Sequence, residues 1–298
     1  MDGIVDFLQQ LANGLALGST YALIALGYTM VYGIIQLINF AHGEFFMVGA
    51  YAGVLVVLAD LPLALAFPAA MAAGALISVG VEQVAYKPLR RKNAGRLTAL
   101  ITAIGISIFL QNVIFLSPGS DLIGLGTKNP LGMEKFIIFD IEIASSKVYI
   151  FLISLFLVIL LVYVVHYTKM GKAMRAVSNN KNIAMLMGIN PDTVISFTFA
   201  VGGALAGAAG LLFALDQNQV SNFMGLLPGL KAFIAAVVGG IGSIPGAMVG
   251  GLILGILETF AVVLGFSLFK DAFAFILLIV ILLIKPAGIM IKSMKEKV

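Results

Sequence analysis

Three residues within the apolar stretches of this chain have side chains that could do chemistry. His42 and Glu44 lie two positions apart in a short segment next to Gly43, and Glu258 lies in a long apolar run whose only adjacent polar residue is Thr259. An ionisable side chain in such surroundings must face protein or water, because exposure to hydrocarbon is costly. Such a group can line a polar path, carry a proton or bond one helix to another.

The position of each group leaves several roles open. His42 and Glu44 could line a polar cavity, bond to backbone groups freed around Asn39, or lie at the cytoplasmic interface. Glu258 has no charged neighbour at helical spacing. For Glu258 a structural bond between helices, or a contact with a partner chain, is favoured over a role as a proton carrier.

The motifs of hydrolytic and metal chemistry are missing from the sequence. It has no Cys and only two His, His42 and His166, so the usual Cys/His zinc sites lack ligands. There is no Gly-rich phosphate loop ending in Lys-Ser/Thr, no His-Glu-x-x-His and no Gly-x-Ser-x-Gly. We therefore expect no catalytic residue, no metal, no cofactor and no ATP hydrolysis by this chain.

The composition places these residues in a membrane. The chain has 298 residues, of which 61% are hydrophobic and 11% charged, and its mean hydropathy is +1.09. At about 20 residues per crossing, the apolar runs predict an all-α integral membrane protein with about nine helices (eight to ten). Residues 1–298 should form a single transmembrane domain. The net charge of +4 does not indicate nucleic-acid binding, because the basic residues cluster in short loops that a bilayer explains.

The basic residues predict the orientation. The segments 87–96, 169–181 and 285–297 hold 13 of the 18 Lys and Arg residues and should be cytoplasmic. No basic residue precedes Lys87, which favours an N-terminus outside the cell; if the region before Leu63 crosses three times, the N-terminus lies inside instead. The loop 117–147 is then extracytoplasmic. Its alternating run 139–143 predicts a short strand, either in a simple hairpin or in a docking surface for an external partner.

Nine apolar segments are expected to be helices, because a backbone in lipid must satisfy its own hydrogen bonds. Small residues recur four apart along several of them, which favours close packing within the chain over a subunit interface. Glu82 lies one turn before a basic cluster, so an ion pair with Lys87 or Arg90 is the ordinary expectation. The expected segments are 7–33, 43–59, 63–86, 97–116, 148–167, 194–215, 230–241, 246–266 and 272–284.

Two glycine-rich breaks interrupt these segments, at 39–44 and 239–246. Glu44-Phe45-Phe46 precedes Gly53 at the spacing at which Lys231-Ala232-Phe233 precedes Gly240, and the two segments should run in opposite directions. This pattern fits an inverted repeat, which transport proteins with broken helices often have near the substrate path. The residues that the sequence offers for a translocation pathway are Asn39, His42, Glu44, Gln111, Asn112 and Glu258.

The cytoplasmic loop 169–191 contains a short predicted helix. Ser178, Asn179 or Asn180 can cap its start, and Gly188 followed by Pro191 can end it. Its apolar stripe consists of Ile183, Leu186 and Met187. So short a helix is not stable alone, so it either packs on its own bundle or fits a groove in a cytoplasmic protein.

Several motifs resemble those of a known family. The sequence is similar to the permeases of branched-chain amino acid ABC importers, specifically the LivH type. The resemblance covers nearly the whole chain. It is carried by the runs 13–33, 38–44, 84–88, 106–112 and 239–248 together with the loop 169–191.

The resemblance implies a five-part importer in the plasma membrane, which in bacteria is the inner membrane. Its parts would be this permease, a homologous second permease, two cytoplasmic ATP-binding subunits and an extracytoplasmic substrate-binding protein. It also implies that the helix from Asn179 to Gly188 is the coupling helix, with Asn179, Asn180, Ile183, Leu186, Met187 and Gly188 at the ATPase. Some relatives carry acidic residues where this chain has Asn179 and Asn180, a difference that bears on which ATPase it accepts.

The implied function is import of leucine, isoleucine and valine, driven by ATP hydrolysed on partner subunits. Within the same family, another amino acid, urea or a short amide is the alternative substrate. A secondary transporter or channel would need its own carboxylates for coupling to an ion gradient. An intramembrane hydrolase is disfavoured, because the sequence lacks a paired nucleophile and base.

Overall fold

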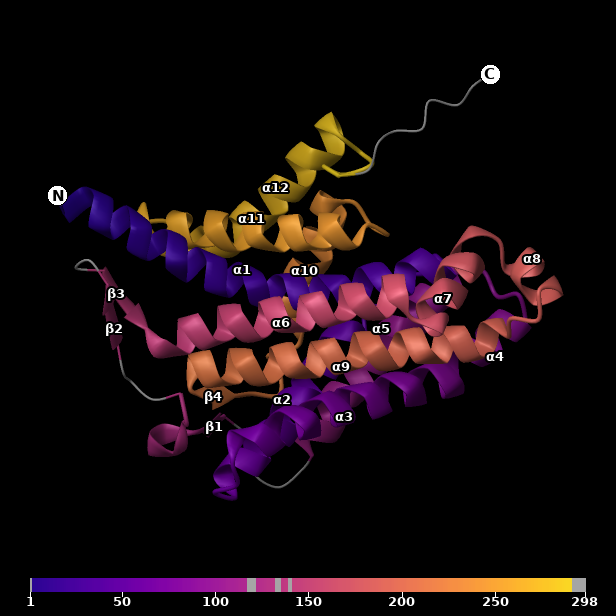
Figure 1. Cartoon of the computed structure of the whole chain (residues 1–298), viewed down its shortest axis with the longest axis horizontal. Helices are drawn as coiled ribbons and strands as arrows, with labels where there is room; N and C mark the ends of the chain where they lie inside the picture. Colours follow the sequence, from indigo (N-terminus) through magenta and orange to yellow (C-terminus); the bar gives the residue numbers. More distant parts are fainter. Residues whose placement is uncertain (1, 117–121, 132–134, 139–140, 291–298) are drawn as a thin grey trace.

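The computed structural model describes residues 2–116, 122–131, 135–138 and 141–290 of the chain. They form an elongated bundle in which most helices run along the long axis (Figure 1). The helices are α1 (Asp2–Ile35), α2 (His42–Leu58), α3 (Leu63–Val81), α4 (Lys87–Arg91), α5 (Arg96–Phe115), α6 (Ser145–Tyr167), α7 (Lys169–Asn179), α8 (Lys181–Leu186), α9 (Pro191–Gln217), α10 (Leu226–Gly239), α11 (Ile244–Val263) and α12 (Lys270–Ile284). The strands are β1 (Ile123–Gly124), β2 (Lys135–Ile138), β3 (Ile141–Ala144) and β4 (Gln219–Val220).

Seven helices of the described part are long and apolar enough to cross a membrane. Two shorter apolar helices, α2 and α10, add to these and coincide with the segments that the glycine breaks interrupt. Together they correspond to the nine predicted segments, and the all-α membrane fold is confirmed. The N-terminus and the β2–β3 hairpin lie at one end of the bundle, and α4, α7 and α8 lie at the opposite end (Figure 1).

The segment predicted to end at Tyr86 continues to Arg91. A π-helical turn, Glu82–Tyr86, joins α3 to α4, and the Lys87 N–H donates to the Glu82 carbonyl. Pro88 explains this turn, because it has no N–H to bond the carbonyl four residues earlier and its ring crowds that carbonyl. The other predicted segments agree with the structure to within five residues at each end.

Glycines let the central helices approach closely. A Cβ added at Gly207 of α9 would overlap the carbonyl oxygen of Ala70 in α3, and one at Gly203 would overlap that of Gly74. On the other side of the bundle, a Cβ at Gly18 of α1 would meet the backbone of α11. These contacts confirm packing within the chain as the role of the glycine spacing.

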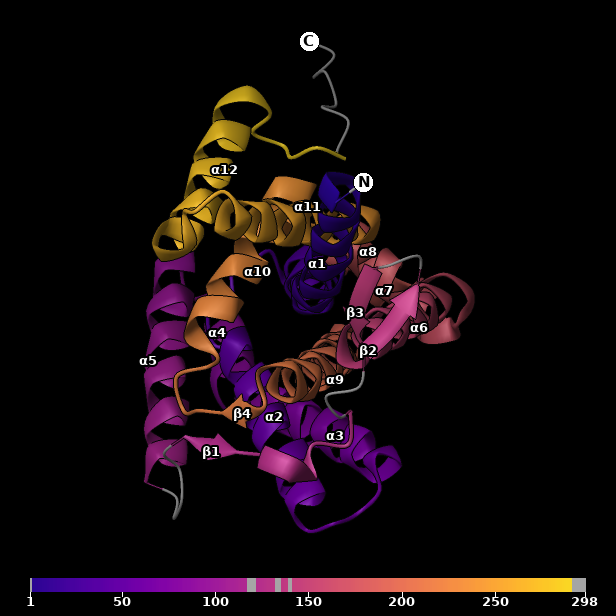
Figure 2. The same cartoon turned by 90° about the vertical axis from the view of Figure 1, so that its left-hand side faces the viewer.

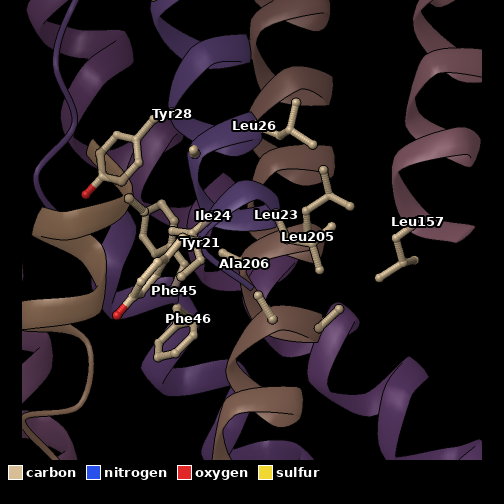
Figure 3. Close-up of a cluster of buried hydrophobic side chains, with 14 of the residues drawn as sticks. Tyr21, Leu23, Ile24, Leu26, Tyr28, Phe45, Phe46, Leu157, Leu205 and Ala206 are labelled. Atoms are coloured by element: carbon tan, nitrogen blue, oxygen red, sulfur yellow. The ribbon is translucent and has the colours of Figure 1, made fainter. Parts of the chain in front are cut away.

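The core lies between α1, α2 and α9, which are largely buried (Figure 2). In Figure 3, Leu23 and Ile24 of α1 lie beside Phe45 and Phe46 of α2, with Leu205 of α9 close by. All of these side chains are buried. Helices α5, α6 and α12 instead expose most of their apolar side chains, as expected of helices that face lipid or another subunit.

Strands of the loop 117–147 take part in two small antiparallel sheets. Strand β2 pairs with β3, with Phe136 opposite Ile143 and Ile138 opposite Ile141. Residues 139–140 of the predicted strand run lie outside the described residues, and 141–143 are in β3. The pairing of β1 with β4, Ile123 opposite Val220, was not expected. It ties the loop after α5 to the segment that leads into α10.

Candidate functional site

The two shorter apolar helices, α2 and α10, meet at their N-terminal ends. Gly43 at the start of α2 packs against Gly225 and Gly229 at the start of α10, where a Cβ on Gly43 would overlap the Gly225 carbonyl oxygen. Helix α2 runs from there toward the end of the bundle that holds the loop 117–147, where the Lys128 ammonium donates a hydrogen bond to the Leu58 carbonyl. Helix α10 ends near α7 and leads into the turn at Gly242. The opposite directions expected of the two segments are therefore observed.

Glu44 lies at this meeting point and is bonded to α5. Its Oε1 accepts hydrogen bonds from Ser107 Oγ and Gln111 Nε2, both at 2.8 Å. Ser107 and Gln111 are four residues apart and thus lie on one face of α5. Glu44 is 1% exposed, and its Oε2 has no hydrogen-bond partner within the described part of the chain.

A cavity of about 320 Å³ adjoins this carboxylate. Glu44, Ser107 and Gln111 contribute polar groups to its lining, and Tyr28, Phe40 and apolar side chains of α5 and α10 contribute most of the remainder. A buried carboxylate oxygen without a partner is costly unless a cation or a donor reaches it. The cavity can therefore receive a ligand whose cationic or donor group meets Glu44 and whose remainder is apolar.

The other expected pathway residues are placed differently. His42 is 1% exposed and packs edge-on against Tyr28 and Phe45, with ring centroids 4.7 and 5.5 Å away. Asn39 accepts a 2.8 Å hydrogen bond from the Tyr86 hydroxyl and so holds the connection between α1 and α2 in place. Asn112 is exposed and donates to the Ile108 carbonyl of its own helix. Of the other five expected pathway residues, Gln111 is the one that lines the same cavity as Glu44.

Glu258 belongs to a second, separate cluster. It forms an ion pair with Lys231 of α10 and accepts a 2.8 Å hydrogen bond from the Tyr21 hydroxyl of α1. Lys231 also pairs with Asp271 at the start of α12, at 2.6 Å. These bonds between helices agree with the structural role favoured for Glu258. Glu258 and Glu44 do not meet at one site, because they line different cavities.

The sequence did contain a signal for this cluster. Lys231 is a basic residue inside an apolar segment, and such a residue must find a partner or water. Glu258 is an acidic residue in the same situation. Ser107 and Tyr21 carried no comparable signal, because hydroxyl side chains are common in membrane helices.

The segment 169–191 contains two helices where one was predicted. The additional helix, α7, begins at Lys169 and is capped by Thr168, whose side chain accepts a hydrogen bond from the Gly171 N–H. The predicted helix is α8, and the Asn180 side chain caps it by accepting from the N–H groups of Asn182 and Ile183. Gly188 has φ +80°, and the Ile189 N–H bonds to the Ala184 carbonyl, which completes a Schellman motif.

Helix α8 protrudes from the end of the bundle opposite the N-terminus (Figure 1), and its apolar stripe is exposed. Ala184 is buried against the bundle, whereas Ile183, Leu186 and Met187 are 58, 86 and 77% exposed. Exposed residues of this kind on a rigid, capped turn can insert into a groove of another protein.

A network of ion pairs connects α4 and the turn before it to the start of α9. Arg90 pairs with Glu82 at 2.8 Å and with Asp192 of α9 at 3.0 Å. Ser196 donates to the second oxygen of Glu82. Of the two partners expected for Glu82, the structure shows Arg90. Through its pair with Asp192, Arg90 also joins α4 to the start of α9, the helix that follows α8.

Comparison with known proteins shows which family this chain resembles. A family profile described as "Branched-chain amino acid transport system / permease component" matches residues 10–282. The chain is 42% identical to the high-affinity branched-chain amino acid transport system permease protein LivH of Escherichia coli K12, over 98% of both chains. It is also 42% identical to BraD of Pseudomonas aeruginosa, which carries the same description, over the full length of both. Identity to the ribose import permease RbsC of Escherichia coli K12 is 26%, over 87% of this chain and 80% of that protein.

Proposed function

The chain belongs to the family of branched-chain amino acid transport permeases, and from this premise we propose that it carries leucine, isoleucine and valine into the cytoplasm. The observation that supports the substrate is the identity of 42% to LivH and BraD over essentially the whole chain, against 26% to a ribose permease. The family consists of permeases of ABC transporters rather than enzymes. Its members work with ATPase and substrate-binding partners.

The complex that we propose has five parts. This chain pairs with a homologous second permease, two ATP-binding subunits attach at the cytoplasmic end, and a substrate-binding protein docks at the extracytoplasmic end. Helix α5, which exposes Ile101, Ile108 and Phe109, offers an apolar face for the second permease beside the Glu44 cavity.

Glu44 and Gln111 are the residues that we assign to the translocation pathway, with Ser107 as their neighbour. The free oxygen of Glu44 suits the ammonium group of an amino acid, and the apolar lining of the cavity suits an aliphatic side chain. Meeting ends of two broken helices are a common location for such a site in transporters. His42 and Asn39 hold the break in position, one by packing and one by its bond to Tyr86.

Coupling to ATP hydrolysis is assigned to α8. Asn180 and Gly188 define its ends, Asn179 is the last residue of α7, and the exposed stripe of Ile183, Leu186 and Met187 enters the ATPase. Burial of such side chains contributes about 1.5 to 3 kcal/mol each. That is enough to hold the docked helix in place.

The test is uptake of labelled leucine into proteoliposomes that contain the purified complex, with ATP inside and the binding protein outside. Uptake should require ATP, and Leu186→Asp should abolish uptake and substrate-stimulated ATP hydrolysis together, because it puts a charge into an apolar contact. The matched control is Leu122→Asp, the same change at a residue 62% exposed at the other end of the molecule. Uptake that follows an ion gradient instead of ATP would overturn the proposal, and full activity of Leu186→Asp would overturn the assignment of α8.

A further inference from the structure

A second and larger cavity, of about 520 Å³, lies at the extracytoplasmic end of the bundle. It is lined by residues of α1, α6, α9, α10 and α11, of the start of α12, and of the segment between α9 and α10. None of the residues that line it lines the Glu44 cavity. The pathway proposed around Glu44 therefore assigns no function to this second cavity.

The inner wall of this outer cavity carries the buried cluster of Lys231, Glu258, Asp271 and Tyr21. Lys231 and Glu258 are 6 and 3% exposed, whereas the Asp271 side chain is 40% exposed and can be reached from the cavity. Lys231 supplies one positive charge against two carboxylates. Lys270 also lines the cavity, so its lining as a whole carries three lysines and three acidic residues and suits a ligand that bears both charges and is neutral overall.

The remaining lining has two distinct parts. Lys147 and Asp216 form an ion pair of 3.7 Å toward the entrance, where their side chains are 27 and 17% exposed. The apolar part of the wall includes Leu17, Phe213, Met224, Leu227 and Val262. The cavity thus combines a partly exposed carboxylate at Asp271, a partly exposed ammonium group at Lys147, and an apolar surface.

We infer that the outer cavity binds an amino acid with an apolar side chain, as a zwitterion, before it reaches the Glu44 cavity. Its ammonium group lies at the Asp271 carboxylate, its carboxylate faces the Lys147 ammonium, and its side chain contacts the apolar wall. A space of about 520 Å³ holds such a molecule together with water. The inference rests on the proposed function, because it takes the same class of substrate.

The test uses the absence of Cys from the chain. Ser221, which lines the outer cavity, is replaced by Cys in the assembled complex without the binding protein or ATP, and the rate of maleimide labelling of this chain is measured. L-leucine should slow the labelling, whereas isocaproate, which has the same side chain and carboxylate but no ammonium group, should not. A control Cys at the exposed Thr127, outside the cavity, should be unaffected by leucine.

Two further substitutions in the Ser221→Cys background locate the bound groups. Asp271→Asn should raise the leucine concentration needed for half protection at least about tenfold, since a hydrogen bond to a charged group is lost. Asp60→Asn, which breaks the exposed pair with Lys128, should leave it unchanged. Leu227→Trp fills the apolar side without touching the ion cluster and should weaken protection by a similar factor, which keeps the test valid if Asp271→Asn fails to assemble.

The results separate this inference from the proposed function, because ATP-driven uptake is measured on the same preparations. Normal leucine uptake without protection of Ser221→Cys would overturn the outer site and leave the proposed function intact. Equal protection by isocaproate, or full protection in Asp271→Asn, would also overturn it and leave the charge cluster as a bond between helices only. Absence of leucine uptake would overturn the proposed function itself.

Discussion

Glu44 and Glu258 are both buried carboxylates in membrane helices, yet their surroundings differ. Glu258 shares its charge with Lys231 and Tyr21, whereas Glu44 has only neutral partners, Ser107 and Gln111, among the described residues. A carboxylate whose charge is already paired stabilises helix contacts. One without a cation is available to a ligand.

Glu44→Gln should lower uptake more than assembly. The amide has nearly the shape of the carboxylate and can retain bonds to α5, but it cannot balance the charge of a substrate ammonium. Loss of one charge-assisted hydrogen bond, about 1.5 to 3 kcal/mol, predicts a decrease in kcat/KM for uptake of at least about tenfold. Asp60→Asn, at an exposed ion pair, serves as the control and should transport normally. Unchanged kinetics of Glu44→Gln would return this residue to a structural role.

Lys231→Met should destabilise the protein, because it leaves Glu258 buried without a cation. Removal of one partner of a buried ion pair costs about 3 to 5 kcal/mol, and the thermal unfolding temperature in detergent should fall. The double variant Lys231→Met with Glu258→Gln should recover much of that loss, since the uncompensated charge is gone. A double variant as unstable as the single one would show that the Lys231 stem, and not its charge, supports the packing.

Helix α9 is the element on which the bundle is assembled, and its glycines set its distance to α3. Gly207→Val should destabilise the fold, because a Cβ there overlaps the Ala70 carbonyl oxygen and the backbone must move. Overpacking of this kind costs about 1 to 3 kcal/mol. Gly105→Val in α5 is the matched control, since it has the same helix-propensity change and no atom within 4 Å of the added Cβ. Thermal stability in detergent distinguishes the two, and equal losses would contradict the packing argument.

Helix α8 has well-defined ends, but its apolar side chains are not covered by the rest of the described chain. Its two caps, Asn180 and Gly188, satisfy the backbone groups at both ends, and yet its six residues expose three large apolar side chains. Such an element needs a second protein for its stability and has a fixed shape to present to it. This combination suits a contact through which one subunit moves another.

At the scale of the molecule, the basic segments 87–96 and 169–181 lie at the end opposite the β2–β3 hairpin (Figure 1). In intact spheroplasts, a membrane-impermeant maleimide should label Thr127→Cys and spare Ser178→Cys, and both should react after lysis. Background labelling of this chain is absent because it has no native Cys. The reverse pattern in intact cells would invert the orientation and place α8 on the wrong side for an ATPase.

The sequence by itself determined the number and approximate ends of the apolar helices, the breaks before α2 and after α10, and the caps of α8. These features follow from local properties: hydropathy over a span, glycine and proline positions, and the side chains next to a helix end. The Glu82–Arg90 ion pair could also be predicted from local sequence, because its partners lie eight residues apart along one nearly continuous helix.

Only the tertiary structure decided which buried groups meet. Lys231 and Glu258 are on different helices, Tyr21 is more than 200 residues from both, and Glu44 is 63 residues from Ser107. Whether such groups touch depends on how each helix is rotated and where it crosses its neighbours, and the glycine contacts set those distances along the whole length of the helices. The separation of the six expected pathway residues between two cavities, the core and the surface follows from this geometry, which no local pattern in the sequence encodes.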